Sequence, residues 1–214
     1  MKTTKVSKNL LKRLPVYLRY IKSLPEHTEN ISATRVAKDL GLGDVMVRKD
    51  LAKISDGGRR KLGYNRELLI RDIETFLDVN STTDAIVVGA GKLGQALLDY
   101  GGFEASGLHV LVGFDLISST RRTGGGKLIF PMAQLESFCR ANRVQIGVIT
   151  VPAEQAQAVC DQLVACGIRA IWNFAPVHLK VPDHVVIQSE NLALSLTALR
   201  MQLKNQDAPD GSRP

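Results

Sequence analysis

The sequence predicts an α/β protein in which a winged helix-turn-helix region precedes a doubly wound parallel sheet and a separate terminal helix. Residues 1–80 hold 17 basic and 10 acidic side chains, whereas residues 81–214 hold 11 of each. Helical periodicity governs the first region, and short apolar runs alternate with helical segments in the second. The uneven charge predicts a head that binds a polyanion, joined to a neutral body.

The composition is that of a folded globular chain. Of the 214 residues, 44% are hydrophobic and 23% are charged, and the net charge is +7. The chain has no apolar run of about 18 residues, and its Lys-rich start lacks the apolar segment of a secretion signal. We therefore expect a cytoplasmic protein without membrane association. Cys139, Cys160 and Cys166 lack metal-binding spacing, so we expect buried apolar side chains and no metal site.

Three helices are expected in the head. Apolar residues recur at helical spacing over residues 9–24, where Pro15 is expected to bend the helix or to begin a new one. Ser32 suits the N-cap of a short helix that reaches Leu40, and Asp44 suits the N-cap of the third helix. In the third helix Val47, Leu51 and Ile54 share the inner side, which leaves Met46, Arg48, Lys49 and Lys53 on the outer face.

A basic hairpin is expected after the third helix. Residues 55–58 (Ser-Asp-Gly-Gly) are typical of a hairpin turn, and a basic triplet follows. This order of elements is that of a winged helix-turn-helix, whose third helix enters the major groove of DNA. An ordinary helical hairpin with a solvated basic surface is the alternative, which the charge imbalance disfavours. The residues expected to contact DNA are Met46, Arg48, Lys49, Lys53, Arg59, Arg60 and Lys61.

A fourth helix is expected to close the core of the head. It spans residues 65–78, and a polar stretch at residues 79–83 follows as the linker. The apolar side chains expected along one side of this helix are Leu68, Leu69, Ile73, Phe76 and Leu77.

A glycine-rich turn follows the first strand of the body. The strand covers residues 85–88, a helix is expected over residues 95–100, and a second strand over residues 109–114 ends at Asp115. The turn reads Gly89-Ala90-Gly91-Lys92-Leu93-Gly94. Strand, glycine turn, helix, strand and acid form the Rossmann pattern that binds a dinucleotide.

Each part of this pattern has a physical role in dinucleotide binding. Gly89 permits the tight turn, Gly91 lets the backbone approach the pyrophosphate, and Gly94 allows the helix to pack closely on the strand. Asp115 accepts hydrogen bonds from the adenosine ribose and repels a 2′-phosphate, which favours NAD(H) over NADP(H). Arg121 and Arg122 weaken that preference. The alternative is a purely structural turn in which Asp115 caps a loop.

The remaining strands alternate with helices, as in a parallel sheet covered on both faces. Ligands bind at the carboxyl ends of such strands, where Thr150, Val151 and Pro152 follow one strand and Asn173 and Phe174 follow another. These residues either border the nicotinamide or form Pro-terminated turns, and the sequence leaves both readings open. The expected strands are 128–130, 145–151, 170–174 and 185–187, with helices at 132–142 and 153–166.

The last helix, expected over residues 191–204, is apolar on nearly all sides. One sheet face cannot bury such a helix, so we expect it to form a homodimer interface, with a core helix of its own chain as the alternative. Residues 205–214 are polar and are expected to be disordered. The expected domains are a winged-helix domain over 1–80, a Rossmann NAD(H) domain over 81–190, the dimerisation helix over 191–204 and the tail.

The sequence offers no catalytic machinery for a nicotinamide enzyme. No tyrosine has a lysine four residues later, and no room remains for a substrate domain. His27, His109, His178 and His184 have no carboxylate or nucleophile at an informative spacing. Binding without turnover is therefore the favoured function, and we expect no catalytic residue.

Several short motifs, spread from residue 13 to residue 176, occur together in one known family. They are Arg13-Leu14-Pro15, Tyr17-Leu18-Arg19, Val47-Arg48-Lys49-Asp50-Leu51, Gly63-Tyr64, the glycine turn, Asp99-Tyr100 with Phe103, Ile149-Thr150-Val151-Pro152-Ala153 and Asn173-Phe174-Ala175-Pro176. In these residues, and over nearly its whole length, the chain resembles the Rex family of bacterial redox-sensing transcriptional repressors.

The resemblance implies a homodimer that represses fermentation and respiration genes, senses the NADH/NAD⁺ ratio and leaves a palindromic operator when NADH binds. It further implies that Arg48, Lys49 and Arg60 contact DNA, that Tyr100 lies near the nicotinamide, and that the last helix is exchanged between subunits. Three alternatives remain: a small NAD-dependent oxidoreductase, a regulator that senses another nucleotide such as coenzyme A, and a DNA-architectural protein that does not respond to nucleotides.

The chain departs from the family pattern in two places. After the recognition helix, Ala52-Lys53-Ile54-Ser55 replaces the family's Ser-Tyr-Phe-Gly, and Lys61 replaces a glycine in the wing. In the last helix Ala193 stands where the family usually has an acid that pairs with the arginine matching Arg19. These departures bear on the operator sequence and on the redox-dependent ion pair.

Overall fold

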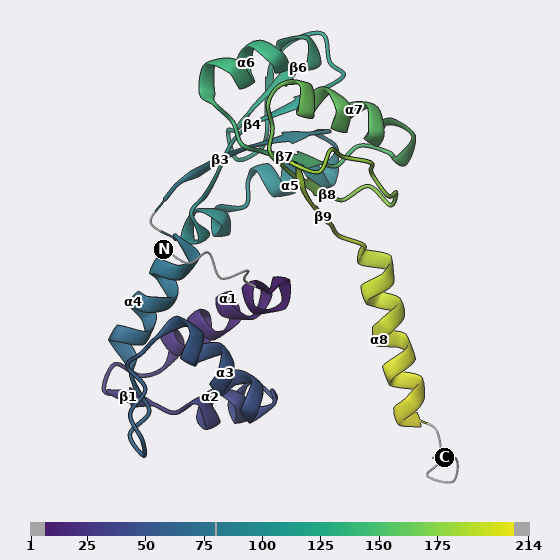
Figure 1. Cartoon of the computed structure of the whole chain (residues 1–214). Helices are drawn as coiled ribbons and strands as arrows, with labels where there is room; N and C mark the ends of the chain where they lie inside the picture. Colours follow the sequence, from purple (N-terminus) through teal and green to yellow (C-terminus); the bar gives the residue numbers. More distant parts are fainter. Residues whose placement is uncertain (1–6, 80, 208–214) are drawn as a thin grey trace. The chain divides into compact units, whose positions relative to one another are not determined.

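The computed structural model describes residues 7–79 and 81–207, which fall into two compact units, Met1–Ser81 and Thr82–Pro214 (Figure 1). The division lies one residue from the expected boundary. Among the described residues, no helix has the length and apolar content needed to cross a membrane.

The first unit is helical, with one short pair of strands. Its elements are α1 (Lys8–Ser23), β1 (Asn30–Ile31), α2 (Ala33–Asp39), α3 (Asp44–Ile54), β2 (Tyr64–Asn65) and α4 (Arg66–Leu77). The sequence did not predict β1 and β2, which pair antiparallel, with Ile31 opposite Tyr64. Two-residue strands are too short to produce an alternating pattern of apolar and polar residues.

Side-chain caps begin most helices of this unit. Ser32 Oγ accepts a hydrogen bond from Arg35 N at 3.1 Å, which confirms the predicted cap, and Asn65 Oδ1 accepts from Leu68 N at 3.0 Å. The cap predicted at Asp44 is wrong, because Gly43 holds the N-cap position and Asp44 begins the helix itself. Pro15 lies inside α1, which continues through it as one element.

The head has its own apolar core. Leu14, Tyr17 and Ile21 of α1 are fully buried against Val47 and Leu51 of α3, as their helical spacing predicted. The predicted apolar side of α4 is partly wrong. The buried residues of α4 are Leu69 and Ile73, which lie four residues apart at the centre of the side that faces the core. Leu68 is 52% and Phe76 36% exposed, because both lie away from that centre.

The second unit is built around a seven-stranded sheet in the order β5-β6-β4-β3-β7-β8-β9. Every neighbouring pair is parallel except β5 with β6, and the parallel strands confirm the predicted doubly wound sheet. The strands are β3 (Thr83–Val88), β4 (Leu108–Asp115), β5 (Arg121–Arg122), β6 (Leu128–Pro131), β7 (Ile146–Ile149), β8 (Ala170–Asn173) and β9 (Val186–Ser189); the helices are α5 (Lys92–Leu98), α6 (Leu135–Asn142), α7 (Ala153–Ala165) and α8 (Leu192–Asp207), with short 3₁₀ helices η1 (Gly101–Ser106) and η2 (Met132–Gln134).

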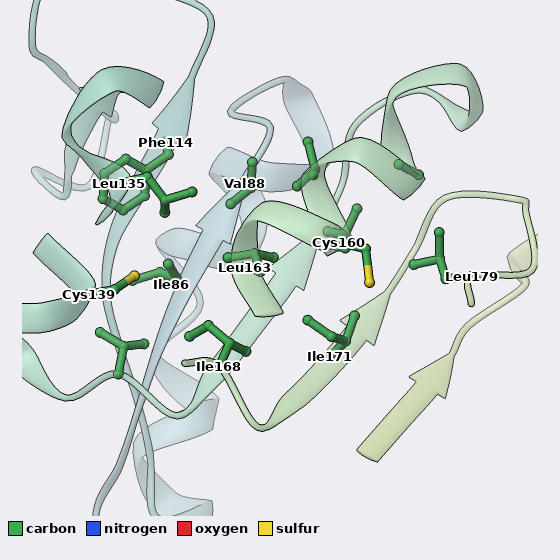
Figure 2. Close-up of a cluster of buried hydrophobic side chains, with 14 of the residues drawn as sticks. Ile86, Val88, Phe114, Leu135, Cys139, Cys160, Leu163, Ile168, Ile171 and Leu179 are labelled. Carbon is green, nitrogen blue, oxygen red and sulfur yellow. The ribbon is translucent and has the colours of Figure 1, made fainter. Parts of the chain in front are cut away.

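Apolar side chains fill both faces of this sheet. On one face α6 and α7 cover Ile86, Val88 and Phe114, and Cys139 and Cys160 are buried there as small apolar residues (Figure 2). On the other face α5 and η1 cover Ala85 and Val87 (Figure 1). Successive residues of β3 thus point to opposite cores, which explains the uninterrupted apolar run that predicted a buried strand.

Several elements differ from the prediction in their bounds or were not predicted. Helix α5 begins at Lys92, inside the glycine motif, whereas we predicted Gln95. Residues 101–106 form η1, which was not predicted because glycine, a poor helix former, opens the segment. Strand β9 is shifted to Val186–Ser189 from the predicted 185–187.

Helix α8 exposes its apolar residues in the single chain. It runs to Asp207, three residues beyond the predicted end, and residues 208–214 of the expected disordered tail lie outside the described residues. Its large apolar side chains are 51 to 67% exposed: Leu192, Leu194, Leu196, Leu199, Met201 and Leu203. The alternative of a core helix within its own chain is therefore wrong.

Candidate functional site

The recognition helix α3 presents its basic residues to solvent. Arg48, Lys49 and Lys53 are exposed, and Met46 is half-buried, on the side away from Val47 and the core. Arg48 makes an ion pair with Asp44 one turn earlier. Within residues 7–79 and 81–207, no ion pair occupies Lys49 or Lys53. The outer face predicted from helical spacing is thus available to a polyanion.

The wing is a tight hairpin with the basic triplet at its tip. Arg59 and Gly63 pair across it through backbone bonds of 2.8 and 2.9 Å. The predicted turn at residues 55–58 is wrong, because the chain reverses at residues 60–62. Lys61 adopts the left-handed conformation with φ of 70°, which glycine adopts at much lower cost. This replacement therefore adds positive charge at a strained position.

A buried acid joins α1 to α3. Asp50 is 5% exposed, and its carboxylate accepts hydrogen bonds from Arg13 Nε at 2.7 Å, Arg13 Nη2 at 2.9 Å and the Tyr17 hydroxyl at 2.9 Å. A bidentate arginine and a phenol together satisfy the buried charge. Asp50 lies directly after Lys49, so these contacts fix the orientation of the recognition helix.

This contact also alters the titration of Tyr17. Burial, followed by the hydrogen bond to Asp50, raises the pKa of Tyr17 to about 12. Because the ordinary value is about 10, folding favours the protonated hydroxyl. Its contribution to stability is present below pH 10 and is lost as the pH rises toward 12.

In the second unit, the three glycines of the turn differ in their surroundings. Gly89 has φ of 97°, and a Cβ built on Gly94 would lie 1.9 Å from the Gly89 carbonyl oxygen. A Cβ on Gly91, by contrast, would meet no atom of the described structure within 4 Å. These surroundings match the roles expected for a tight turn, for close packing of helix on strand, and for open backbone that a pyrophosphate can approach.

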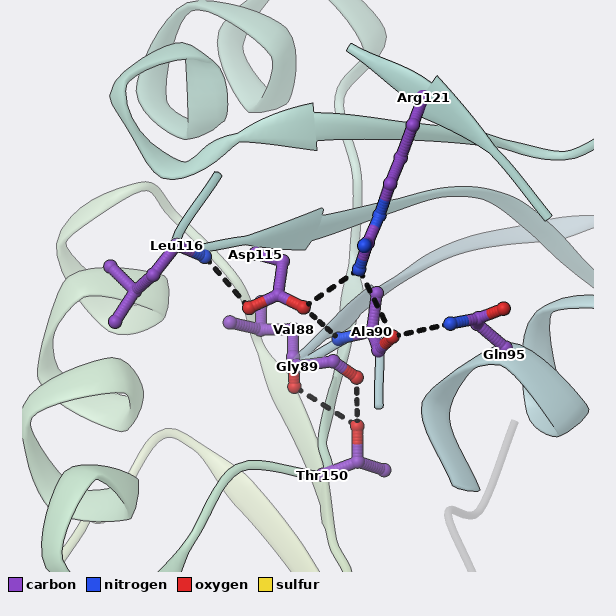
Figure 3. A network of polar contacts seen from close by, with 8 residues as sticks. All are labelled: Val88, Gly89, Ala90, Gln95, Asp115, Leu116, Arg121 and Thr150. Carbon is purple, nitrogen blue, oxygen red and sulfur yellow. Dashed lines mark hydrogen bonds and ion pairs between the residues drawn. The ribbon is translucent and has the colours of Figure 1, made fainter. Parts of the chain in front are cut away.

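Two side chains outside the motif hold this turn (Figure 3). Thr150 Oγ1 donates to the Gly89 carbonyl at 2.6 Å, and Gln95 Nε2 donates to the Ala90 carbonyl at 2.7 Å. Thr150 was predicted as a cofactor contact, and its hydroxyl here supports the turn. Gln95 was missed, because a single amide in a helix carries no sequence signal.

Asp115 lies at the end of β4 beside the turn. Its Oδ2 accepts from Ala90 N at 3.0 Å, its Oδ1 accepts from Leu116 N at 2.7 Å, and Arg121 Nη2 lies 3.4 Å from Oδ2 (Figure 3). The carboxylate borders a cavity of about 280 Å³ that Gly89 and Val151 also line. Apolar side chains, among them Met132 and Val159, form another part of the wall, which suits an adenosine whose ribose faces the acid.

The residues predicted near the nicotinamide come from two strand ends and from the N-cap position of η1. Asn173 is fully buried, and its side chain bonds to Ala175 N at 2.9 Å and to the Val177 carbonyl at 3.0 Å, so it also shapes its own loop. Phe174 packs on Trp172 with ring centroids 4.6 Å apart. Tyr100 is 60% exposed and contacts Phe103 edge to face.

The other predicted residues lie around the same turn. Lys92 and Leu93 are exposed in the first turn of α5, and Pro152 is exposed at the start of α7. Among the residues that the structure describes, no three His, Cys, Asp or Glu side chains are grouped to hold a metal ion. The arrangement can bind a dinucleotide. His109, for which the sequence indicated no carboxylate partner, lies 3.4 Å from Asp84, at the amino ends of β4 and β3 and so at the opposite end of these strands from the glycine turn.

Proteins of similar sequence match this chain over almost its entire length. The Redox-sensing transcriptional repressor Rex of Thermoanaerobacter pseudethanolicus is 35% identical over 211 residues, which cover 96% of this chain and 93% of that protein. The repressor of the same name from Treponema denticola is 37% identical over 201 residues, 92% and 94% of the two chains. The chain belongs to the Rex family.

Solved Rex structures share the fold. The crystal structure of RSP in complex with beta-NAD+ and operator DNA has a TM-score of 0.86 and 32% identity, covering 96% of this chain and 95% of that one. The crystal structure of RSP in complex with beta-NADH has a TM-score of 0.84 and 32% identity, with coverage of 96% and 97%. Two family models also match: "Putative DNA-binding protein N-terminus" over residues 5–52 and "CoA binding domain" over residues 80–177.

Membership of the Rex family confirms the resemblance inferred from the motifs, and it agrees with a regulator rather than an enzyme. The structure connects three of those motifs, because Arg13 and Tyr17, from two of them, both donate hydrogen bonds to Asp50 of the recognition-helix motif. The roles predicted for individual residues remain predictions. Ala193 is exposed in α8, and Arg19 makes no ion pair within the described part of the chain.

Substitutions in the glycine turn separate binding from folding. We expect Gly91→Val to fold normally and to weaken NADH binding at least tenfold, because the new side chain occupies the space that the pyrophosphate needs. We expect Gly94→Ala to lower the melting temperature, because its Cβ meets backbone. Energy transfer from Trp172, the one tryptophan of the chain, to bound NADH measures binding.

Gly124→Ala is the matched control. Its Cβ also meets nothing within 4 Å, in a turn away from Gly89, so both binding and melting temperature should stay at their original values. Unchanged NADH binding by a folded Gly91→Val protein would contradict the assignment of the turn.

Asp50→Asn tests the buried contact in the head. Removing one partner of a buried ion pair costs about 3 kcal/mol, so the head should lose about that much unfolding free energy in urea. Asp44→Asn, on the exposed side of the same helix, is the control and should cost about 1 kcal/mol or less. Equal losses in the two variants would mean that Asp50 does not hold α1 and α3 together.

Proposed function

We propose that the chain is a homodimeric transcriptional repressor that binds a palindromic operator through its head and leaves it when NADH binds to the second unit. The observation that carries this proposal is the open approach to the Gly91 backbone beside Asp115, in a chain whose other unit carries an exposed basic helix and wing. A nucleotide site and a DNA-binding surface in one chain suit a sensor better than a catalyst.

The DNA contacts are assigned to α3 and the wing. The exposed basic residues Arg48, Lys49 and Lys53 supply charge along the recognition helix, and the basic triplet supplies it at the tip of the wing. RSP, a Rex-family repressor of closely similar fold, was crystallised with operator DNA. Affinity that comes from phosphate contacts falls steeply with salt, so the operator complex should be salt-sensitive.

NAD(H) is assigned to the turn that contains Gly89, Gly91 and Gly94. The open backbone at Gly91 suits the pyrophosphate, Asp115 suits the hydroxyls of the adenosine ribose, and the strand ends at Thr150 and Asn173 suit the nicotinamide half. RSP was crystallised both with beta-NAD+ and with beta-NADH. The nicotinamide itself supplies the redox information, and the chain's residues bind and orient it.

Dimerisation is assigned to α8. Its large apolar side chains are more than half exposed in the single chain, and such a surface on one helix is unfavourable in water. A second copy that packs against α8 would bury them, and a two-fold dimer would match a palindromic operator. NADH would then release DNA by binding more tightly to a dimer whose heads do not fit both half-sites.

Coenzyme A is the second candidate ligand, because the family model matched over residues 80–177 is described as a CoA binding domain. An oxidoreductase is less favoured, since the His109–Asp84 pair lies at the amino ends of the strands, away from the glycine turn at their carboxyl ends. NADH consumption with a panel of carbonyl substrates would distinguish an oxidoreductase, and thermal stabilisation by coenzyme A but not NADH would distinguish the other regulator.

A titration of the DNA complex tests the proposal. DNA is first selected from a random double-stranded pool with the full chain and NAD⁺, then bound at two salt concentrations while NADH, NAD⁺ or coenzyme A is added. We expect NADH to weaken DNA binding at least tenfold and NAD⁺ to leave it nearly unchanged. Retention of DNA by the NADH-saturated protein would refute the proposal, and release by coenzyme A alone would favour the second candidate.

Lys61→Gly tests the wing. Relief of the left-handed conformation should raise the unfolding free energy of the head by about 1 kcal/mol, while loss of one charge weakens DNA binding and lowers the salt slope by about 1. Arg143→Gly is the matched control, because Arg143 also has a left-handed φ, of 49°. The substitution removes the same charge, but from the second unit. The control should be stabilised without loss of DNA affinity; equal losses in both variants would exclude a specific contact at Lys61.

A further inference from the structure

An arginine contacts the aspartate that borders the ribose pocket. Arg121 Nη2 lies 3.4 Å from Asp115 Oδ2 and 3.4 Å from the Ala90 carbonyl oxygen (Figure 3). The two backbone bonds to Asp115, from Ala90 N and Leu116 N, are shorter, at 3.0 and 2.7 Å. Arg121 is therefore the most loosely held partner of this carboxylate.

The backbone of Arg121 is fixed although its side chain is 47% exposed. Arg121 pairs with Ile129 in the sheet, and Thr123, which is 6% exposed, donates its hydroxyl to Asp99 at the end of α5. Gly125 N also donates to Asp99, at 3.1 Å. The backbone is thus held in place, and the half-exposed side chain is the part of Arg121 that has room to reorient beside Asp115.

The chemistry of these two side chains is opposite toward a substituent on the 2′ oxygen of the ribose. A carboxylate accepts from a free 2′-hydroxyl and repels a 2′-phosphate, whereas a guanidinium binds a phosphate through two parallel hydrogen bonds. Asp115 lines the cavity, and Arg121 reaches it through the 3.4 Å contact with the Asp115 carboxylate. A partner for either nucleotide thus lies at or next to the cavity, and in this structure the arginine contacts Asp115.

We propose that Arg121 and Asp115 together set the choice between NADH and NADPH, with Arg121 as a phosphate partner that Asp115 holds in check. The proposal rests on the assignment of NAD(H) to this turn. With the acid present, the free 2′-hydroxyl is preferred and displaces the loosely held guanidinium. When a neutral residue replaces Asp115, Arg121 turns to the 2′-phosphate and the preference reverses.

Direct binding of NADH and NADPH to the full chain, without DNA, tests this assignment through energy transfer from Trp172. The original protein should bind NADH at least tenfold more tightly than NADPH. Asp115→Ser should tighten NADPH binding by about tenfold to a hundredfold, the range expected for a hydrogen bond between charged groups, and weaken NADH binding. Adding Arg121→Ala to Asp115→Ser should abolish the NADPH gain and leave NADH binding nearly unchanged.

Arg122→Ala is the matched control, because the neighbouring Arg122 donates to the Gly126 carbonyl at 2.8 Å and does not contact Asp115. In the Asp115→Ser background it should leave NADPH binding intact. Equal effects of Arg121→Ala and Arg122→Ala on NADPH, or no NADPH gain in Asp115→Ser, would overturn the proposal.

Two further measurements keep the outcome decisive. If Asp115→Ser does not fold, Asp115→Asn retains an oxygen for the two backbone donors and should show the same reversal. In the otherwise unaltered protein, Arg121→Ala should weaken NADPH binding and preserve NADH binding. Weaker NADH binding with preserved NADPH binding would also refute the assignment. If NADH binds with this preference but does not release DNA, the proposed repressor function is wrong, whereas the roles of Arg121 and Asp115 in nucleotide choice stand.

Discussion

The second unit depends on one close approach of backbone to backbone, where α5 passes the carbonyl of Gly89. A Cβ on Gly94 would lie 1.9 Å from that oxygen, so only glycine lets the helix begin directly at the end of β3. Thr150 from the neighbouring strand end donates to the same carbonyl. The turn is therefore held by the sheet itself, and the open backbone at Gly91 is a consequence of this packing.

The head depends on a different constraint, a charge removed from water. Asp50 is almost fully buried. Hydrogen bonds from Arg13 and Tyr17, on one turn of α1, offset the free-energy cost of removing its charge from water. An apolar contact would tolerate several packings of α3 on α1, whereas a bidentate pair with a phenol restricts them to one. The outward direction of the basic residues next to Asp50 follows from that restriction.

Features that involve many residues could be predicted from the sequence. The period of the apolar residues predicted the helices of the head, the uninterrupted run at residues 85–88 predicted a buried strand, and the glycine spacing predicted the turn. Strands β1, β2 and β5 escaped prediction because two residues define no period. The wing turn was misplaced because Lys61 takes a conformation that its residue type does not signal.

The candidate site shows the same division. Asp115 could be predicted because its distance from the glycine turn is characteristic of the fold. The contacts of Gln95 with Ala90 and of Arg121 with Asp115 could not be predicted, since both depend on where a long side chain points and not on residue spacing. Arg121 was visible in the sequence only as a charge near the acid, and its meaning comes from the 3.4 Å contact and from a backbone that Asp99 holds in place. Specificity here arises from a pair of opposite charges, each of which alone would favour a different nucleotide.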